Sequence, residues 1–222
     1  MSLLKANKIT FNYENSAVFK DLSFSLDNGD FLCIVGPNGC GKSTLLKCLV
    51  GQNKLSSGKI TFGNDFHFNQ IGYMPQNPKF NDSFPASVYE IVASGALNRV
   101  KLLEPYPKER INSALKALNI QNIARKRFSN LSGGQRQKVL LARAIVASEE
   151  LLILDEPSNN LDYHSKQDFY KTLQKLNETL TIIMVTHDLD HNNLIGNKIL
   201  SLDKDHPFFG TTAEYVRRIH AH

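Results

Sequence analysis

The order of apolar and polar positions predicts the main elements of this chain. Three short segments, residues 31–35, 151–154 and 182–185, are apolar at every position. Such continuous runs are typical of strands that are buried on both faces of a parallel sheet. Residues 3–27 instead alternate between apolar and polar side chains, as antiparallel strands with one covered face do. The pattern therefore predicts an α/β fold with a parallel core and an N-terminal antiparallel β subdomain.

Helical periodicity accounts for much of the remaining chain. Helices are expected over residues 42–50, 87–96, 107–118 and 136–148, and again from Thr212 after a short pair of strands. In the third helix, four apolar side chains share one face: Ile111, Ala114, Leu115 and Leu118. We expect one domain over residues 1–222. Its catalytic lobe is expected at about 1–76 and 134–222, with a helical insertion subdomain at about 77–133.

A glycine-rich segment joins the first apolar run to the first helix. It comprises Gly36, Pro37, Asn38, Gly39, Cys40, Gly41, Lys42 and Ser43. Its three glycines permit backbone N–H groups to turn inward around an anion at the N-terminus of a helix. A strand, a loop of this kind and a helix, in that order, are the context that a phosphate-binding loop requires. The segment therefore predicts a binding site for the phosphates of a nucleotide.

Side chains at the start of the first helix complete this predicted site. Lys42 is placed to bring a positive charge to the β- and γ-phosphates, and Ser43 to offer a hydroxyl ligand to Mg²⁺. Thr44 is placed to contact the α-phosphate. The expected ligands are therefore ATP and Mg²⁺.

Two carboxylates follow the second apolar run. Asp155 and Glu156 stand at its carboxyl end, which is the edge of a parallel α/β sheet where ligands bind. Asp155 is expected to hold Mg²⁺ through water, and Glu156 to orient the attacking water or accept its proton. An Asp-Glu pair is usually a solvated strand end, but this pair follows a run of the buried type. The sequence therefore predicts an ATPase.

A further motif points to a family. Leu131, Ser132, Gly133, Gly134 and Gln135 match the signature of ATP-binding cassette (ABC) proteins without a substitution. The chain resembles the nucleotide-binding subunit of an ABC transporter along essentially its whole length. Other elements of that family follow in the expected order: Tyr13 as the adenine-stacking aromatic, Gln76 after a strand and a proline, residues 158–162 as the D-loop, and His187 after the third apolar run.

The resemblance implies a P-loop NTPase of the ABC ATPase class whose site is completed by a second copy of the chain. In this family Ser132 and Gly134 contact the γ-phosphate that the other subunit holds. The implied ATP-binding residues are Tyr13, Gly36, Pro37, Asn38, Gly39, Cys40, Gly41, Lys42, Ser43, Thr44, Ser132, Gly133, Gly134 and Gln135. The implied metal ligands are Ser43, Gln76 and Asp155, and the implied catalytic residues are Glu156, His187 and Gln76.

Three of these residues also have a structural interpretation. The alternative for Tyr13 is a strand aromatic that faces the core. The alternative for Gln76, which follows a proline, is an ordinary turn residue. The alternatives for His187 are a capping residue and a buried, hydrogen-bonded imidazole.

Composition narrows the partners. The net charge of +5 comes without an arginine-rich run or basic residues interleaved with aromatic ones, so it gives no case for nucleic acid. The sequence has no signal peptide and no apolar stretch near 18 residues, which a membrane span needs. We therefore expect the chain to act at the cytoplasmic face of the cell membrane through integral permease subunits, and indirectly with a solute-binding protein. The expected docking surface for the permease is residues 77–89.

The cysteines and histidines add little to the predicted chemistry. Cys33, Cys40 and Cys48 are too few and too scattered for a disulfide framework or a zinc site. Cys33 and Cys48 are expected in the core. Packing is the default interpretation of Cys40 as well, but its position among inward-facing amides predicts a partly activated thiol that is accessible when the phosphate site is empty. The spacing of the histidines near the C-terminus, which include His206, His220 and His222, is not that of a metal-ligand set.

The cargo is inferred from weaker marks. Residues 84–88, 167–173 and 202–210 resemble the zinc/manganese-type metal importers, whereas residues 159–162 are nearer the iron-siderophore and cobalamin importers. We expect import of a divalent metal ion, with a metal chelate as the alternative.

Other classes of ABC protein fit the sequence less well. Translation-factor types carry two cassettes in one chain, and chromosome or repair types separate the phosphate loop from the signature by a long coiled coil. Here Lys42 and Asp155 are 113 residues apart with no heptad run between them. A structural dimer that does not hydrolyse ATP would lack a base such as Glu156.

Overall fold

The structure, a computed structural model, describes residues 2–14, 16–63, 66, 68–76, 85–97, 107–159, 161–187, 195–203 and 207–220. The chain divides by packing into two units, one of Met1–Phe68 with Asn177–His222, and one of Asn69–Leu176. These units are defined by packing alone. They do not test the expected catalytic lobe and helical subdomain, whose limits near residues 77 and 133 remain a prediction.

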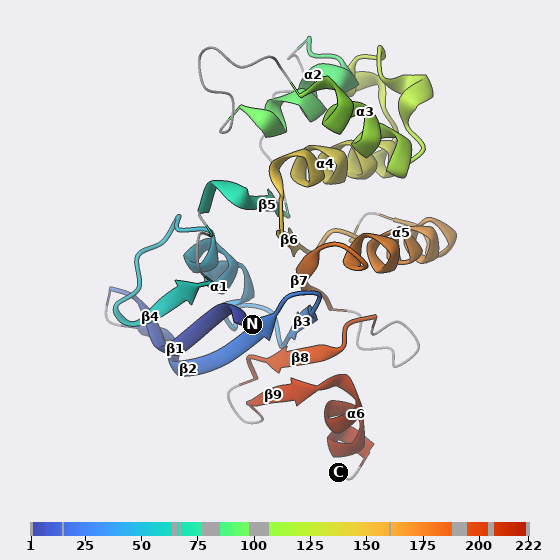
Figure 1. The fold of residues 1–222 in the computed structure, drawn as a ribbon. Helices are drawn as coiled ribbons and strands as arrows, with labels where there is room; N and C mark the ends of the chain where they lie inside the picture. Colours follow the sequence, from blue (N-terminus) through green and yellow to red (C-terminus); the bar gives the residue numbers. More distant parts are fainter. Residues whose placement is uncertain are drawn as a thin grey trace. The chain divides into compact units, whose positions relative to one another are not determined.

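An antiparallel sheet of three strands opens the first unit (Figure 1). β1 (Ser2–Tyr13) pairs with β2 (Ser16–Asp27) on one side and with β4 (Ser57–Phe62) on the other. The expected antiparallel subdomain is therefore confirmed. Its third strand is not predicted by the hydrophobic pattern, because β4 carries only two apolar side chains, Ile60 and Phe62.

Parallel strands form the centre of the first unit. β3 (Phe31–Val35) lies between β7 (Thr181–Val185) and β8 (Lys198–Ser201) and runs parallel to both. Every residue of β3 and β7 is buried, which confirms the prediction from their continuous apolar runs. The helix α1 (Lys42–Leu49) follows β3 through the glycine-rich loop. β9 (Phe208–Thr211) pairs antiparallel with β8 and leads into α6 (Thr212–His220), as the sequence predicts.

The second unit combines two parallel strands with a helical layer. β5 (Ile71–Met74) pairs with β6 (Leu151–Asp155), and α2 (Val88–Ala93) and α3 (Lys108–Ala117) pack on α4 (Gly133–Ala147) (Figure 1). α5 (Tyr163–Asn177) follows β6 after a loop. The 3₁₀ turns are η1 (Phe68–Gln70), η2 (Ser94–Ala96), η3 (Gln121–Ile123) and η4 (Phe128–Asn130). None of the helices in the described part of the chain has the length and apolar content needed to cross a membrane.

Close packing of α4 fixes the core of this second unit. A Cβ atom on Gly72 of β5 would overlap the carbonyl oxygen of Ala144, so only glycine lets α4 approach the strand this closely. The predicted apolar face of α3 is confirmed, since Ile111, Ala114 and Leu115 are buried, and so is Leu118 just beyond the helix.

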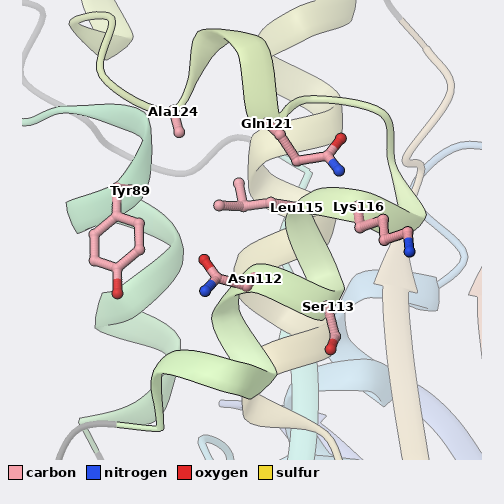
Figure 2. A pocket seen from close by; sticks show the side chains of 7 residues that line it. All are labelled: Tyr89, Asn112, Ser113, Leu115, Lys116, Gln121 and Ala124. Atoms are coloured by element: carbon pink, nitrogen blue, oxygen red, sulfur yellow. The ribbon is translucent and has the colours of Figure 1, made fainter.

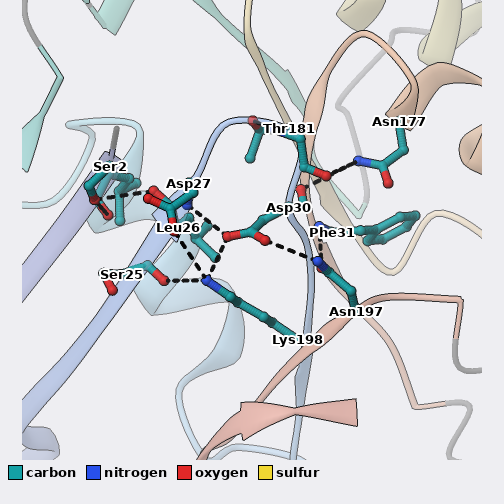
Figure 3. Close-up of polar contacts among 12 residues, drawn as sticks. Ser2, Ser25, Leu26, Asp27, Asp30, Phe31, Asn177, Thr181, Asn197 and Lys198 are labelled. Carbon is teal, nitrogen blue, oxygen red and sulfur yellow. Dashed lines mark hydrogen bonds and ion pairs between the residues drawn. The ribbon is translucent and has the colours of Figure 1, made fainter. Parts of the chain in front are cut away.

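A buried carboxylate joins the amino ends of the central strands in the first unit (Figure 3). Asp30 is 7% exposed and accepts hydrogen bonds from the backbone N–H of Asp27 at 2.7 Å and from Nδ2 of Asn197 at 3.0 Å. It also forms an ion pair of 2.6 Å with Nζ of Lys198. Burial alone would raise the pKa of Asp30, but these three partners together hold it below its usual range. The carboxylate therefore ties the end of β2 to the starts of β3 and β8.

We expect Asp30→Asn to lower the free energy of unfolding at pH 7 by about 1.5–3 kcal/mol, because it removes the charge of a hydrogen-bonded buried group. The pKa of Asp30 is lower in the folded chain than in the unfolded chain, so the stabilisation is complete above about pH 4 and is lost as the pH falls through the folded-state value. Urea unfolding at pH 7 and at pH 3, followed by circular dichroism, measures both effects.

Asp27→Asn is the matched control for this measurement. Asp27 is 63% exposed at its side chain and lies 3.9 Å from Lys198, so its loss should change the stability by less than about 1 kcal/mol. Equal losses in the two variants, or a loss in Asp30→Asn that does not shrink at low pH, would contradict this account.

Candidate active site

The predicted phosphate loop connects β3 to α1. Gly36, Gly39 and Gly41 have φ angles of 143°, 79° and 107°, in the region that L side chains rarely adopt. The prediction that these glycines permit the turns of the loop is therefore confirmed. Gly41 caps the N-terminus of α1, and a Cβ atom there would overlap Cγ1 of Val18 on β2. The antiparallel sheet thus packs directly against the start of the helix.

The lysine of this loop is enclosed by the loop itself. Lys42 is 5% exposed, and its Nζ donates hydrogen bonds to the carbonyl oxygens of Gly36 at 2.8 Å and Pro37 at 2.9 Å. Both partners are neutral, so these contacts hold the ammonium group in place without neutralising its charge. Ser43 and Thr44 stand beside it in the first turn of α1 and are partly exposed. This arrangement presents a fixed positive charge at a helix N-terminus, where an anion is stabilised.

Tyr13 lies at the end of a row of aromatic rings that leads to the phosphate loop. It is 53% exposed and meets Phe11 edge to face, with ring centroids 4.9 Å apart. Phe11 in turn lies 6.2 Å from Phe19, which contacts the Cβ position of Gly41. The interpretation of Tyr13 as a core aromatic is therefore wrong. Stacking on adenine remains a prediction.

The default interpretation of Cys40 as a packing residue is confirmed, and the alternative expectation of an accessible thiol is wrong. Cys40 is 8% exposed, because its Sγ packs beneath the loop, 2.9 Å from the Cβ position of Gly36. Cys33 and Cys48 are buried as predicted. Burial raises the pKa of Cys33 to about 12 and that of Cys48 to about 11.

His187 follows its strand at the same edge from which the phosphate loop begins. β3 and β7 run parallel with Ile34 opposite Val185, and the N–H of Thr186 donates to the carbonyl oxygen of Ile34 at 3.2 Å. Gly36 therefore lies two residues after Ile34, and His187 lies two residues after Val185, the pairing partner of Ile34. His187 is exposed, so its interpretation as a buried imidazole is wrong.

The second unit brings the predicted carboxylates and the glutamine together in the same way. Met74 of β5 stands opposite Leu154 of β6, and Gln76 and Glu156 each follow these positions by two residues. Nε2 of Gln76 donates a hydrogen bond to Oε2 of Glu156. Glu156 is 8% exposed and has a φ angle of 50°, so a buried carboxylate is held on a left-handed backbone.

Asp155 ends β6 and is almost fully buried. It is 3% exposed, and its negative charge acts with burial to raise the pKa of Tyr73 on the neighbouring strand to about 12, burial being the larger cause. Gln76 and Asp155 of this unit offer an amide and a carboxylate oxygen, which is the oxygen chemistry that Mg²⁺ prefers. Gln76 directs its nitrogen to Glu156, and its oxygen is the atom suited to a cation. The donor set therefore fits Mg²⁺.

A residue of the predicted D-loop contacts the predicted base, and sequence reasoning did not assign it this role. Nδ2 of Asn159 donates to Oε2 of Glu156, the same oxygen that Gln76 reaches. Asn159 lies two residues after a proline, in a turn, where asparagine is common for its backbone conformation alone. No signal in the sequence separates this role from an ordinary turn residue.

The signature segment forms the N-terminus of α4. Oγ of Ser132 accepts a hydrogen bond from the N–H of Gln135 at 3.4 Å, and Oε1 of Gln135 accepts one from the N–H of Ser132 at 3.2 Å. This capping box starts the helix at Gly133, so the predicted start at Arg136 is wrong. The spacing of serine and glutamine is itself the signal that would have located the start. Ser132 and Gly133 are exposed, so this helix end faces solvent in the single chain.

A small hollow lies among the helices of the second unit (Figure 2). Its volume is about 330 Å³, and it is lined by Tyr89, Asn112, Ser113, Leu115, Lys116, Gln121 and Ala124. The Asn112 side chain of α3 points across it toward Tyr89 of α2. Tyr89 is the last residue of the segment that the sequence predicts as a docking surface. Residues 77–84 of that segment, Asn160 of the D-loop, His206 and His222 lie outside the described residues.

Comparison with known proteins identifies the family. Residues 19–159, more than half of the chain, match the ABC transporter family. The chain is 38% identical to the zinc uptake system ATP-binding protein ZurA of Listeria innocua, over 96% of this chain and 87% of that protein. It is 33% identical to the high-affinity zinc uptake system ATP-binding protein ZnuC of Bacillus subtilis, over 92% of each chain.

Solved structures give the same result. A structure of an inward-facing metal-chelate type ABC transporter is 35% identical to this chain, with a TM-score of 0.83 over 96% of this chain and 84% of that one. The predicted α/β fold of an ABC ATPase is therefore confirmed. The chain belongs to the ABC transporter family, as an ATP-hydrolysing cassette subunit.

Proposed function

We propose that the chain is the ATP-hydrolysing subunit of a transporter that imports a divalent metal ion of the zinc or manganese type. The observation that carries the cargo is the similarity to ZurA, a protein named for zinc uptake, over 96% of this chain. The buried cation in the phosphate loop and the buried carboxylate after β6 support the ATPase chemistry.

In the proposed reaction the phosphate loop and Lys42 bind the phosphates, and Tyr13 stacks on the adenine. Glu156 holds the attacking water and takes its proton as the water oxygen bonds to the γ-phosphorus and the bond to the leaving ADP oxygen breaks. His187 donates a hydrogen bond to the γ-phosphate. Ser43, Gln76 and Asp155 would hold Mg²⁺, which would supply positive charge to neutralise the phosphate oxygens. Catalysis is therefore mainly positioning and electrostatic stabilisation.

A second copy of the chain is proposed to complete this site. The exposed start of α4 offers the hydroxyl of Ser132 and the N–H groups of Gly133 and Gly134, which suit the γ-phosphate of a nucleotide bound to the other copy. ATP then binds the paired state more tightly than the separate chains, and this difference in affinity can drive a membrane partner between two conformations.

Glu156→Gln tests the base and the pairing together. The glutamine keeps the shape of the base but removes its charge, so hydrolysis should fall by at least about 100-fold, while ATP binding survives. The variant should accumulate as an ATP-bound dimer, measured by size exclusion with light scattering. Adding Ser132→Arg should abolish the dimer, because a bulky side chain fills the facing phosphate site.

Asn122→Arg in the Glu156→Gln background is the control for added bulk and charge, because Asn122 is an exposed residue of η3. It should leave the ATP-bound dimer intact. A Glu156→Gln variant that stays monomeric in saturating ATP, or a dimer that survives Ser132→Arg, would show that the site is not shared between copies.

The membrane partner is proposed to dock on the hollow beside Tyr89. Its volume is at the small end of the range for ligand pockets, which suits one or two side chains at the tip of a partner segment. Its lining includes the buried Leu115 and the exposed Lys116, so it fits a cytoplasmic helix with an apolar anchor and an acidic group. Docking there would place the chain at the cytoplasmic face of the membrane, and a solute-binding protein would act through the same permease.

Asn112→Arg tests this docking surface, because a long charged side chain would fill the hollow toward Tyr89. We expect the variant to lose co-purification with its membrane subunits by at least about tenfold, the result of roughly 1.4 kcal/mol of lost binding. ATP-driven pairing in the Glu156→Gln background should remain, which shows that the fold is intact. Asn122→Arg should leave the complex unchanged. A complex that tolerates Asn112→Arg would place the docking surface elsewhere.

A metal chelate is the second candidate cargo. It is favoured by the 35% identity to the metal-chelate type transporter and by the sequence of residues 159–162. The two cargoes differ in size and charge, and the choice between them lies in the membrane and solute-binding subunits.

The complex with its own partner subunits, reconstituted in liposomes, separates the two cargoes. We expect ATP-dependent uptake of Zn²⁺ or Mn²⁺ and none of an iron-siderophore complex. Lys42→Ala should abolish uptake by removing the cation of the phosphate loop. Lys47→Ala is the control, because Lys47 is an exposed lysine of the same helix. Uptake of the chelate alone would overturn the metal-ion proposal and leave the ATPase proposal standing.

A further inference from the structure

The backbone at Glu156 requires contacts to hold it in place. Its φ angle of 50° puts a residue with a Cβ atom in the left-handed region, which costs free energy that the surroundings must offset. The side chain is 8% exposed, so the carboxylate is also withdrawn from much of the solvent that would stabilise its charge. The contacts that offset both costs therefore decide where the carboxylate points.

The turn after Glu156 supplies some of these contacts. The N–H of Asn159 donates to the carbonyl oxygen of Glu156 at 3.4 Å, which closes the turn. Between them, the hydroxyl of Ser158 meets the phenol of Tyr170 on α5 at 3.1 Å, and both residues are buried. The turn is thereby anchored to α5, and the start of the Asn159 side chain is held relative to Glu156.

Two carboxamides converge on one oxygen of the carboxylate. Nδ2 of Asn159 and Nε2 of Gln76 both donate to Oε2 of Glu156. An ionised carboxylate only accepts hydrogen bonds, so the nitrogen of each amide must face it. Hydrogen bonds to a charged acceptor are stronger than those between neutral groups. Two such bonds on a single oxygen, from different loops, restrict rotation of the carboxylate about its last bond.

The two amides are not equivalent. Gln76 is a proposed ligand of Mg²⁺, so its side chain has a second task at the same site. Asn159 belongs to the turn that Glu156 itself begins, and its side chain reaches back to the residue three positions before it. Its contact is therefore the one tied most directly to the backbone of the base.

We propose that Asn159 is a positioning residue for ATP hydrolysis, which orients the Glu156 carboxylate by donating a hydrogen bond to Oε2. It acts through Glu156 and contacts no atom of the nucleotide. This inference rests on the proposed role of Glu156 as the base. Because orientation matters for the chemical step and not for holding ATP, loss of Asn159 affects kcat and spares KM.

Three variants of the full chain test the proposal by steady-state ATPase kinetics at saturating Mg²⁺. Asn159→Ala removes the donor, and kcat should fall by about 10- to 100-fold, as when supporting partners of other active-site groups are removed. KM and the affinity for ATP should stay within about twofold. Asn159→Asp has nearly the same shape but sets a like charge against Glu156, so its kcat should be lower still. Asn122→Ala, the control at an exposed asparagine of η3, should match wild type.

A double-mutant cycle shows whether Asn159 acts through Glu156. In the Glu156→Gln background, measured by single-turnover hydrolysis, Asn159→Ala should cause no further loss. Asn159→Asp should lose its extra penalty there, because glutamine carries no charge and can donate a hydrogen bond to the aspartate. A merely structural role would instead give the isosteric Asn159→Asp the mildest effect.

The outcomes separate this inference from the proposed function. If Glu156→Gln hydrolyses ATP at the wild-type rate, the base is misassigned. If Glu156→Gln is inactive but Asn159→Ala and Asn159→Asp retain wild-type kcat, the positioning role of Asn159 is overturned and the base stands. A further tenfold loss from Asn159→Ala in the Glu156→Gln background would also overturn it, because Asn159 would then act on something other than Glu156.

Discussion

Burial of the parallel strands on both faces is the constraint on which the site depends. A strand such as β3 or β7, with every residue buried, has no position along its length for a charged group that must meet a ligand. Functional groups are therefore placed at the strand ends and in the loops and helix starts that follow them. The register then aligns these loops, since Gly36 and His187 follow paired positions in the first unit, and Gln76 and Glu156 do so in the second. Chemistry that is scattered along the sequence is gathered by strand pairing.

The same confinement produces buried charges that are held by neutral dipoles. Nζ of Lys42 donates to carbonyl oxygens of its own loop, and Oε2 of Glu156 accepts hydrogen bonds from the amides of Gln76 and Asn159. A neutral partner fixes a charge in space without cancelling its field, whereas an ion pair would cancel much of it. Asp30 is the contrasting case, because it forms an ion pair of 2.6 Å with the cation Lys198. Its role is to join strands. The neutral partners of Lys42 thus leave the field of its charge available to a ligand.

Much of this fold follows from local patterns. The continuous apolar runs predict β3, β6 and β7, because a strand that is buried on both faces needs an apolar residue at every position. The helical period of the apolar residues predicts α3, because only one face of that helix is buried. β4 escapes prediction because its stability comes from pairing with β1 and not from apolar content. Tertiary contacts also decide the exposure of Tyr13 and the burial of Cys40. Tyr13 packs against Phe11, and Cys40 packs against Gly36, and neither contact follows from the type of residue.

Motif chemistry located most of the candidate site, but not the contacts that set its geometry. The glycines, Lys42 and Glu156 are predictable because phosphate binding and water activation demand those residue types in that order. Asn159 is not, since an asparagine in a turn has several explanations and only the fold brings its amide to Oε2 of Glu156. The capping box of Ser132 and Gln135 is the intermediate case. Its spacing is visible in the sequence, and its consequence is that the small residues Gly133 and Gly134 occupy the first turn of α4, where an anion can approach the helix N-terminus without meeting a side chain.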